Sequence, residues 1–103
     1  MTYHASRAQL PAERDGGRVA RATWMAGCHV AFEALPEGIR LGDARRRASW
    51  GYLFKGRLRA DLADGNTFEI RAGEAYHLPP GHRVQATEDS ELVEFSLRRE
   101  DDA

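Results

Sequence analysis

The most strongly patterned stretch of this sequence is SWGYLFK, residues 49–55. Its three aromatic side chains, Trp50, Tyr52 and Phe54, recur at every second position, so they lie on one face of an extended chain. Ser49, Gly51 and Leu53 fall on the opposite face, and the first two of these are small. This alternation predicts a β-strand over the whole stretch.

Shorter stretches of the same kind follow one another along the chain, separated by turn residues about every eight to twelve positions. The residues ADGN at 63–66 predict a hairpin turn, because Asp-Gly tolerates the positive φ angles that such turns need. The residues PPG at 79–81 predict a rigid turn. The further strands are expected at 19–24, 28–33, 57–62, 67–71, 75–78, 84–87 and 92–97. This pattern predicts an all-β fold, either a sandwich or a closed barrel of antiparallel strands.

Composition limits the class of protein. The chain has 103 residues, of which 42% are hydrophobic, and this suits one domain with a single modest core. Its 15 basic and 16 acidic side chains give a net charge of −1, which argues against a general nucleic-acid binder. No apolar run reaches the ~20 residues of a membrane span, so no membrane partner is expected. The single cysteine, Cys28, excludes an internal disulfide and agrees with a cytoplasmic location.

The chain is expected to divide into three parts. Residues 1–17 are polar and end in Asp-Gly-Gly, which predicts an N-terminal arm that can be exchanged between the subunits of a dimer. Residues 18–98 contain the strands and form the barrel, and residues 99–103 form an acidic tail. Fourteen arginines against one lysine, together with sixteen alanines, indicate a GC-rich bacterial source.

Two stretches carry a resemblance to a known family: WGYLFKGRL at 50–58 and GEAYHLPPGH at 73–82. The second matches the second motif of the cupins, G-x5-P-x-G, from Gly73 to Gly81, and the first matches the strand that ends their first motif, with Gly56 as its final glycine. The chain thus resembles a cupin over more than half of its length, and in detail the small single-domain cupins of actinobacteria with WGY and PPGH signatures. The resemblance implies a jelly-roll β-barrel, usually in a dimer.

The resemblance also implies where a metal would be held. Metal-dependent cupins use two histidines and a glutamate of the first motif and one histidine of the second. The corresponding positions here are Asp43 and Arg45 (or Gly42 and Ala44 with the longer spacing), Ser49, and Val84. Iron, manganese or zinc needs three or more well-placed N, O or S ligands. We therefore expect a degenerate metal motif and no cofactor. An atypical divalent-metal site stays open as an alternative, drawn from His29, Glu33, Asp43, His77 and His82.

Arginine and histidine supply the candidate polar groups. The arginines 45–47 lie where the resemblance places the loop that enters the barrel. Arg45 is the candidate anchor for an anionic ligand, because guanidinium binds carboxylate or phosphate with paired hydrogen bonds; alternatively, all three arginines are solvated. His82 shares strand parity with Val84, so it can face the interior as a general acid or base. The alternative is a turn histidine bonded to backbone.

The residues at 28–33, CHVAFE, also alternate. His29 and Glu33 share a face about 13 Å apart, and they either line one cavity or form an outward polar face. Cys28 is expected to pack as a small apolar residue. The opposite parity of His77 and Tyr76 predicts a surface or interface position for His77. The candidate ligand-binding residues are Arg45, Ser49, His29, Glu33 and Tyr52.

If Ser49 faces inward, Trp50, Tyr52 and Phe54 face outward, and we expect a partner surface to cover them in a homodimer. The leading functional hypothesis is a metal-free cupin that binds a small polar or anionic organic molecule, with proton-transfer catalysis (isomerisation, dehydration or cyclisation) through His82. One alternative is a non-catalytic module for ligand sensing or protein interaction. The other is a metal-dependent enzyme with an atypical ligand set.

Overall fold

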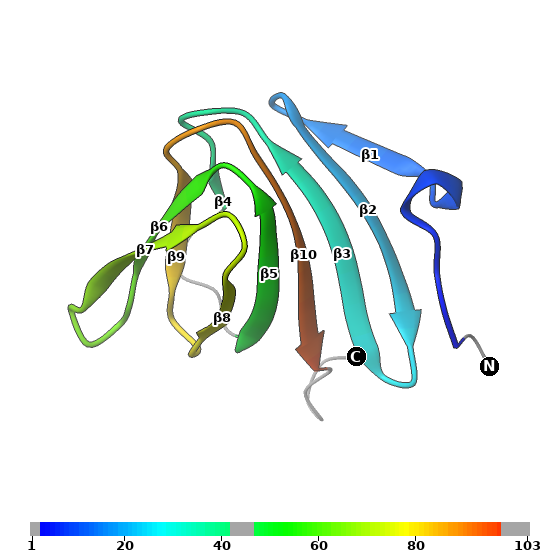
Figure 1. Cartoon of the computed structure of the whole chain (residues 1–103). Coiled ribbons are helices and arrows are strands. Elements are labelled where there is room, and N and C mark those ends of the chain that lie inside the picture. Colours follow the sequence, from blue (N-terminus) through cyan, green and yellow to red (C-terminus); the bar gives the residue numbers. More distant parts are fainter. Residues whose placement is uncertain (1–2, 42–46, 98–103) are drawn as a thin grey trace.

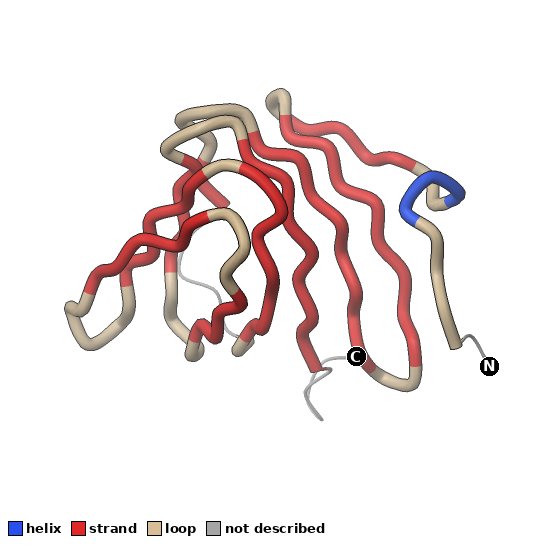
Figure 2. Tube along the Cα trace, viewed as in Figure 1, coloured by secondary structure: helices blue, strands red, loops and turns tan. Residues whose placement is uncertain are grey.

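The computed structural model describes residues 3–41 and 47–97, and these residues form two antiparallel β-sheets (Figure 1). Figure 2 shows that strands dominate the trace, with one short 3-10 helix near the N-terminal end. The elements are η1 (Arg7–Gln9), β1 (Ala12–Asp15), β2 (Arg18–Met25), β3 (Cys28–Leu35), β4 (Arg40–Leu41), β5 (Ser49–Lys55), β6 (Arg57–Asp61), β7 (Thr67–Arg71), β8 (Ala75–Leu78), β9 (Arg83–Ala86) and β10 (Ser90–Leu97). Among these residues, no helix is long and apolar enough to cross a membrane.

The two sheets pack face to face as a jelly roll, which confirms the all-β prediction. The larger sheet has the order β1-β2-β3-β10-β5-β8, and the smaller has the order β4-β9-β6-β7. Strands distant in sequence are therefore neighbours, and β10, near the C-terminal end, pairs with both β3 and β5. This sheet order brings β10, β5 and β8 side by side, and the candidate interior site lies on these three strands.

The predicted strands agree with the structure to within two residues at each end, and β5, β7 and β8 agree at both ends. The sequence did not predict β1 or β4. All four residues of β1 are exposed, so it has no apolar alternation to reveal it. It forms because a tight turn between Asp15 and Arg18 folds it back onto β2. The segment 1–17, expected to be an arm, thus contributes a strand to the sheet of its own chain.

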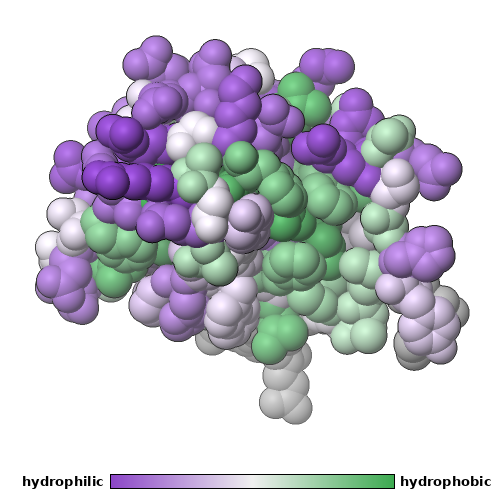
Figure 3. Space-filling model, in the orientation of Figure 1, coloured by the Kyte–Doolittle hydropathy of each residue, from purple (hydrophilic) through white to green (hydrophobic). Residues whose placement is uncertain are grey.

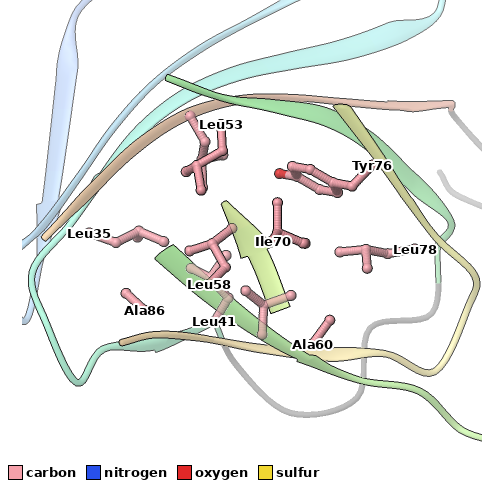
Figure 4. Packing of buried hydrophobic residues seen from close by; sticks show 11 residues of the cluster. Leu35, Leu41, Leu53, Leu58, Ala60, Ile70, Tyr76, Leu78 and Ala86 are labelled. Atoms are coloured by element: carbon pink, nitrogen blue, oxygen red, sulfur yellow. The ribbon is translucent and has the colours of Figure 1, made fainter. Parts of the chain in front are cut away.

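Aliphatic side chains from both sheets fill the space between them (Figure 4). The largest members are leucines that are almost fully buried: Leu35, Leu41, Leu53, Leu58, Leu78 and Leu92. Strand β5 supplies one of them, and its inward residues Ser49, Gly51 and Leu53 are all buried. The three aromatic residues between and beyond them are exposed, as the alternation in the sequence predicted.

Apolar side chains also cover the outer face of the larger sheet. The register places Phe32, Val93 and Tyr52 in one row across β3, β10 and β5. A second row contains Val30, Phe95 and Trp50, and Phe54 lies beyond Tyr52 on β5. We refer to these seven residues as the outer belt. Figure 3 shows an apolar band over the middle of this sheet. The larger sheet therefore has apolar residues on both of its faces.

Gly56 joins β5 to β6 at a point where no side chain fits. Its φ is +95°, and a Cβ there would lie 2.7 Å from the Cα of Ser90 and against the backbone of Asp89. Gly65, in the hairpin between β6 and β7, has a similar φ of +91°, but a Cβ added there would meet no atom within 4 Å. A substitution at Gly65 therefore tests the effect of the positive φ alone, whereas a substitution at Gly56 adds steric crowding to it.

Gly56→Ala should destabilise the protein more than Gly65→Ala. Positive φ alone costs an alanine about 1–2 kcal/mol, and the collision with the Asp89–Ser90 backbone should add roughly 1–3 kcal/mol at Gly56. Urea unfolding of both variants measures the difference directly. Equal losses in the two variants would show that the strand junction moves aside at little cost.

Candidate functional site

A buried polar contact of the described interior joins Tyr76 on β8 to Glu94 on β10. The Tyr76 hydroxyl donates a hydrogen bond to Oε2 of Glu94 at 3.0 Å. Both residues lie directly beside Gly51 of β5, one on each side. The tyrosine ring extends over Gly51, where a Cβ would overlap the ring. The absent side chain at residue 51 is therefore what allows Tyr76 to reach Glu94.

This pair is buried, and its tyrosine belongs to the hydrophobic core cluster. Tyr76 is 8% exposed and Glu94 is 5% exposed. A carboxylate taken out of water is costly unless hydrogen bonds replace those it loses, and a hydroxyl that donates to a carboxylate is among the stronger ones. The pair thus places a fixed acceptor and a fixed hydroxyl on the inner wall of the barrel.

Two of the positions that the cupin resemblance assigns to metal ligands are described, and both point inward. Ser49 is 2% exposed and pairs with Leu78, while Val84 is 2% exposed and belongs to the core. Neither side chain suits iron, manganese or zinc. No group of three or more His, Cys, Asp and Glu residues lies together in residues 3–41 and 47–97. The remaining positions, Gly42 to Arg45, lie outside the described residues, so Asp43 and Arg45 have no structural account here.

His82 lies in the interior, with no exposed surface. It directly precedes β9 and is buried on the same side of the chain as Val84, as the parity of the sequence suggested. Its Nδ1 lies 2.8 Å from the carbonyl oxygen of Pro79. A carbonyl only accepts hydrogen bonds, so Nδ1 carries the proton and donates it. Nε2 is then the acceptor nitrogen of the neutral ring. Both alternatives from the sequence hold together: His82 faces inward and is bonded to the backbone of its turn.

His29 and Glu33 lie on the inner face of β3, while Cys28 lies on the outer face. The outward polar face considered from the sequence is therefore not formed. Glu33 is buried and accepts a hydrogen bond from Nε of Arg18 at 2.6 Å within an ion pair. His29 packs against Trp24, with ring centroids 4.9 Å apart.

Sequence reasoning missed Arg18, Tyr76 and Glu94 as partners in this interior. Arg18 directly follows a turn, and nothing in the alternation of β2 marks its ion pair with Glu33. The sequence did contain one signal for Tyr76, its opposite parity to His77. For Glu94 the signal was a carboxylate at the inward parity of a strand that also contains Leu92. Connecting the two required knowledge that β10 and β8 both flank β5.

The structure corrects two of the candidates. Tyr52 lies on the outer belt, with its ring centroid 5.3 Å from that of Phe54, so it cannot line the interior. His77 lies on the same outer face, stacked on Trp50 with ring centroids 5.0 Å apart. Both residues follow the outward parity of their strands. His77 therefore cannot join His29 and His82 in an interior metal set, because it lies on the outer face of the larger sheet.

Comparison with solved structures identifies the architecture. An RmlC-like cupin from Shewanella frigidimarina superposes with a TM-score of 0.78 at 20% sequence identity, and the match covers 98% of this chain and 96% of that one. The fold is that of a cupin. An oxalate decarboxylase from Bacillus subtilis gives a TM-score of 0.74 at 20% identity, covering 90% of this cupin domain and 28% of the decarboxylase chain.

A Streptococcus pyogenes protein of unknown function has the same cupin architecture at a TM-score of 0.69 and 16% identity, with 81% of this chain and 75% of that one covered. No protein-family model and no curated protein sequence matches the chain. These similarities establish the fold, and the chemistry of this cupin has to be argued from its own residues.

Tyr76→Phe should cost about 1–3 kcal/mol in the free energy of unfolding, because the buried Glu94 carboxylate loses a donor. The matched control is Tyr52→Phe, whose hydroxyl lies on the exposed outer face and should matter by less than about 0.5 kcal/mol. Denaturant unfolding at neutral pH checks both values. The interaction is confirmed if Tyr76→Phe costs clearly less when Glu94 is replaced by Leu, since a double-mutant cycle isolates the pair.

Proposed function

We propose that this cupin binds a small polar or anionic organic molecule inside the barrel, without the usual cupin metal. The observation that carries the proposal is the buried Tyr76–Glu94 hydrogen bond on the inner wall. Buried polar groups inside a mainly apolar pocket are the usual means by which small-molecule sites orient a ligand. A hydroxyl, amide or ammonium group of the ligand would donate to Glu94, and a second donor group would face the Tyr76 hydroxyl oxygen, whose own proton is donated to Glu94.

The proposed reaction, where the cupin catalyses one, is a proton transfer such as isomerisation, dehydration or cyclisation. His82 supports this choice, because its Nδ1 is fixed as a donor to Pro79 and its ring can therefore exchange a proton only at Nε2. Arg45 remains the proposed anchor for an acidic group on the ligand. Ser49 and His29 are the other proposed ligand contacts, since both lie on the inner face.

Replacement of the metal ligands supports the metal-free part of the proposal. The Bacillus subtilis oxalate decarboxylase, a structural neighbour, has Mn(II) centres. In this cupin, Ser49 and Val84 stand at two of the four ligand positions, so even full use of the other two would leave fewer than three typical ligands. The residues present thus do not fit the metal site of the family, and no step is assigned to a metal.

The second candidate function is a non-catalytic module that senses a ligand or binds another protein. The outer belt favours it, because a large exposed apolar surface on a small domain marks an interaction site. The two candidates differ in what they require of the interior. Catalysis needs both His82 and the Tyr76–Glu94 pair to contact the ligand, whereas an interaction module needs only the outer surface.

A panel of small carboxylic acids, hydroxy acids and amino acids should include a ligand that stabilises the protein against heat. We expect a rise in Tm of about 4 °C or more, which corresponds to roughly 1 kcal/mol for a domain of this size. Glu94→Gln should remove the rise while preserving the shape of the site, and a chelator should leave it unchanged. Differential scanning fluorimetry of the wild type, of the wild type with the chelator and of Glu94→Gln provides the test.

Tyr52→Phe is the control for that experiment, because its hydroxyl lies outside the barrel, and it should leave the ligand-induced rise intact. An equal rise in Glu94→Gln would place the ligand elsewhere and reject the interior site. A rise that disappears with the chelator would reject the metal-free proposal. Absence of any stabilising compound would favour the interaction module.

We propose further that two copies of this cupin associate through the outer belt. Trp50 is 43% exposed, Phe54 is 49% exposed and Phe95 is 38% exposed, so the isolated chain leaves three large aromatic side chains partly in water. The rows of the belt run across the sheet, and a second copy can present the same rows in an isologous contact. Burial of this surface is the proposed driving force for association.

Phe95→Glu should convert the proposed dimer to a monomer, because it places a charge at the centre of the apolar contact. Phe68→Glu is the matched control: Phe68 is equally exposed, at 37%, but lies on β7 of the other sheet. Light scattering coupled to size-exclusion chromatography distinguishes the two states. A monomeric wild type, or a Phe95→Glu protein that remains dimeric, would contradict an interface on the outer belt.

A further inference from the structure

A recess lies outside the barrel, on the inner face of β1 and β2. These two strands extend the larger sheet beyond the region faced by the smaller sheet (Figure 1). Two of their inward residues, Ala20 and Ala22, are small, and they form the floor of a shallow shelf. A cavity of about 260 Å³ lies on this shelf. Its lining residues are Pro11, Glu13, Ala20, Ala22, Thr23, Trp24 and His29.

Trp24 forms the aromatic wall of this shelf. It is 47% exposed, although a tryptophan rarely leaves so much apolar surface in water without a reason. His29, its partner across the strands, packs against it at a tilt of 52°, which holds the indole ring in place. The guanidinium of Arg47 lies 5.8 Å from the centre of the same ring. The indole of Trp24 therefore already attracts a cation within this chain.

Glu13 forms the acidic side of the shelf. It lies directly opposite Ala20 in the register of β1 and β2, so its carboxylate shares the inner face with the alanine floor. Within the part of the chain that the structure describes, no hydrogen bond or ion pair joins the Glu13 side chain to another residue. The side chain is exposed. A negative charge thus borders a cavity that also has an aromatic wall.

We propose that this shelf binds a small organic ammonium cation. The indole of Trp24 would attract the cation, the carboxylate of Glu13 would supply the opposite charge, and the alanine floor would accept the apolar groups around the nitrogen. The cavity has about the volume of eight or nine water molecules in the liquid, which limits the ligand to a few carbon atoms around the charged centre. The shelf does not include the Tyr76–Glu94 pair, and it shares only His29 with the residues of the proposed barrel site.

Choline is a suitable probe, because its charged centre is compact and surrounded by methyl groups. Titration of the ¹⁵N-labelled full chain should shift the indole N–H signal of Trp24 and the amide signals of Ala20 and Ala22 in a saturable way. The neutral alcohol in which carbon replaces the ammonium nitrogen has the same shape and should bind about fivefold more weakly or worse. Equal binding of the two compounds would overturn the proposal.

Two variants test the residues of the shelf, and two matched controls accompany them. Trp24→Leu and Glu13→Gln should each weaken choline binding by about fivefold or more. Trp50→Leu is the control for the first, because Trp50 is similarly exposed and also stacks on a histidine, but on the outer face. Glu37→Gln, at an exposed carboxylate away from the shelf, is the control for the second.

Both controls should bind choline within about twofold of the wild type. Loss of binding in a control, or unchanged binding in Trp24→Leu or Glu13→Gln, would assign the cation to another surface and reject the shelf site. If Trp24→Leu fails to fold, the comparison of choline with its neutral isostere and the Glu13→Gln variant still decide the question. None of these substitutions alters the interior pair, so failure here leaves the proposed barrel function unaffected.

Discussion

The contact of Tyr76 with Glu94 across Gly51 is the constraint on which the inner wall of this protein depends. It joins three neighbouring strands at one level, because Glu94, Gly51 and Tyr76 are direct partners in the register. A shift of one residue in any of these strands would turn its member of the set to the outer face. The contact therefore specifies strand register as well as polarity, a role that buried polar pairs fulfil in several other folds.

That register also explains why the larger sheet has two apolar faces. Once Glu94 points inward, Val93 and Phe95 must point outward, and the same parity sends Phe32 outward and Glu33 inward on β3. The interior tolerates Glu33 because Arg18 pairs with it. On the outer face the aromatic side chains of β5 pack on their neighbours and still stay partly exposed. The exposed aromatic side chains of the outer belt thus follow from the same register that builds the interior.

Much of the fold could be predicted from local patterns, because strand alternation and turn chemistry depend on residues close in sequence. The orientation of β5, the hairpin at residues 63–66 and the inward position of His82 were all accessible in this way. Strand β1 was not, since its charged residues pair only because β2 offers an edge. The Tyr76–Glu94 pair was also inaccessible, because it depends on the order β10-β5-β8, which no local pattern encodes. Gly51 matters to the site because the long-range sheet order places it between Glu94 and Tyr76.

The cupin resemblance assigns the last ligand histidine to the position of Val84, and the packing at this position does not suit a histidine. Val84, at the position of the last ligand histidine, lies in a row between Leu41 of β4 and Ala60 of β6. All three are buried in the aliphatic core, so an imidazole there would have to leave water without a polar neighbour in that row. A single substitution at Val84 would thus lower stability before it could contribute to a metal site. Both sheets supply the apolar core, whereas the buried carboxylates Glu33 and Glu94 both lie on strands of the larger sheet.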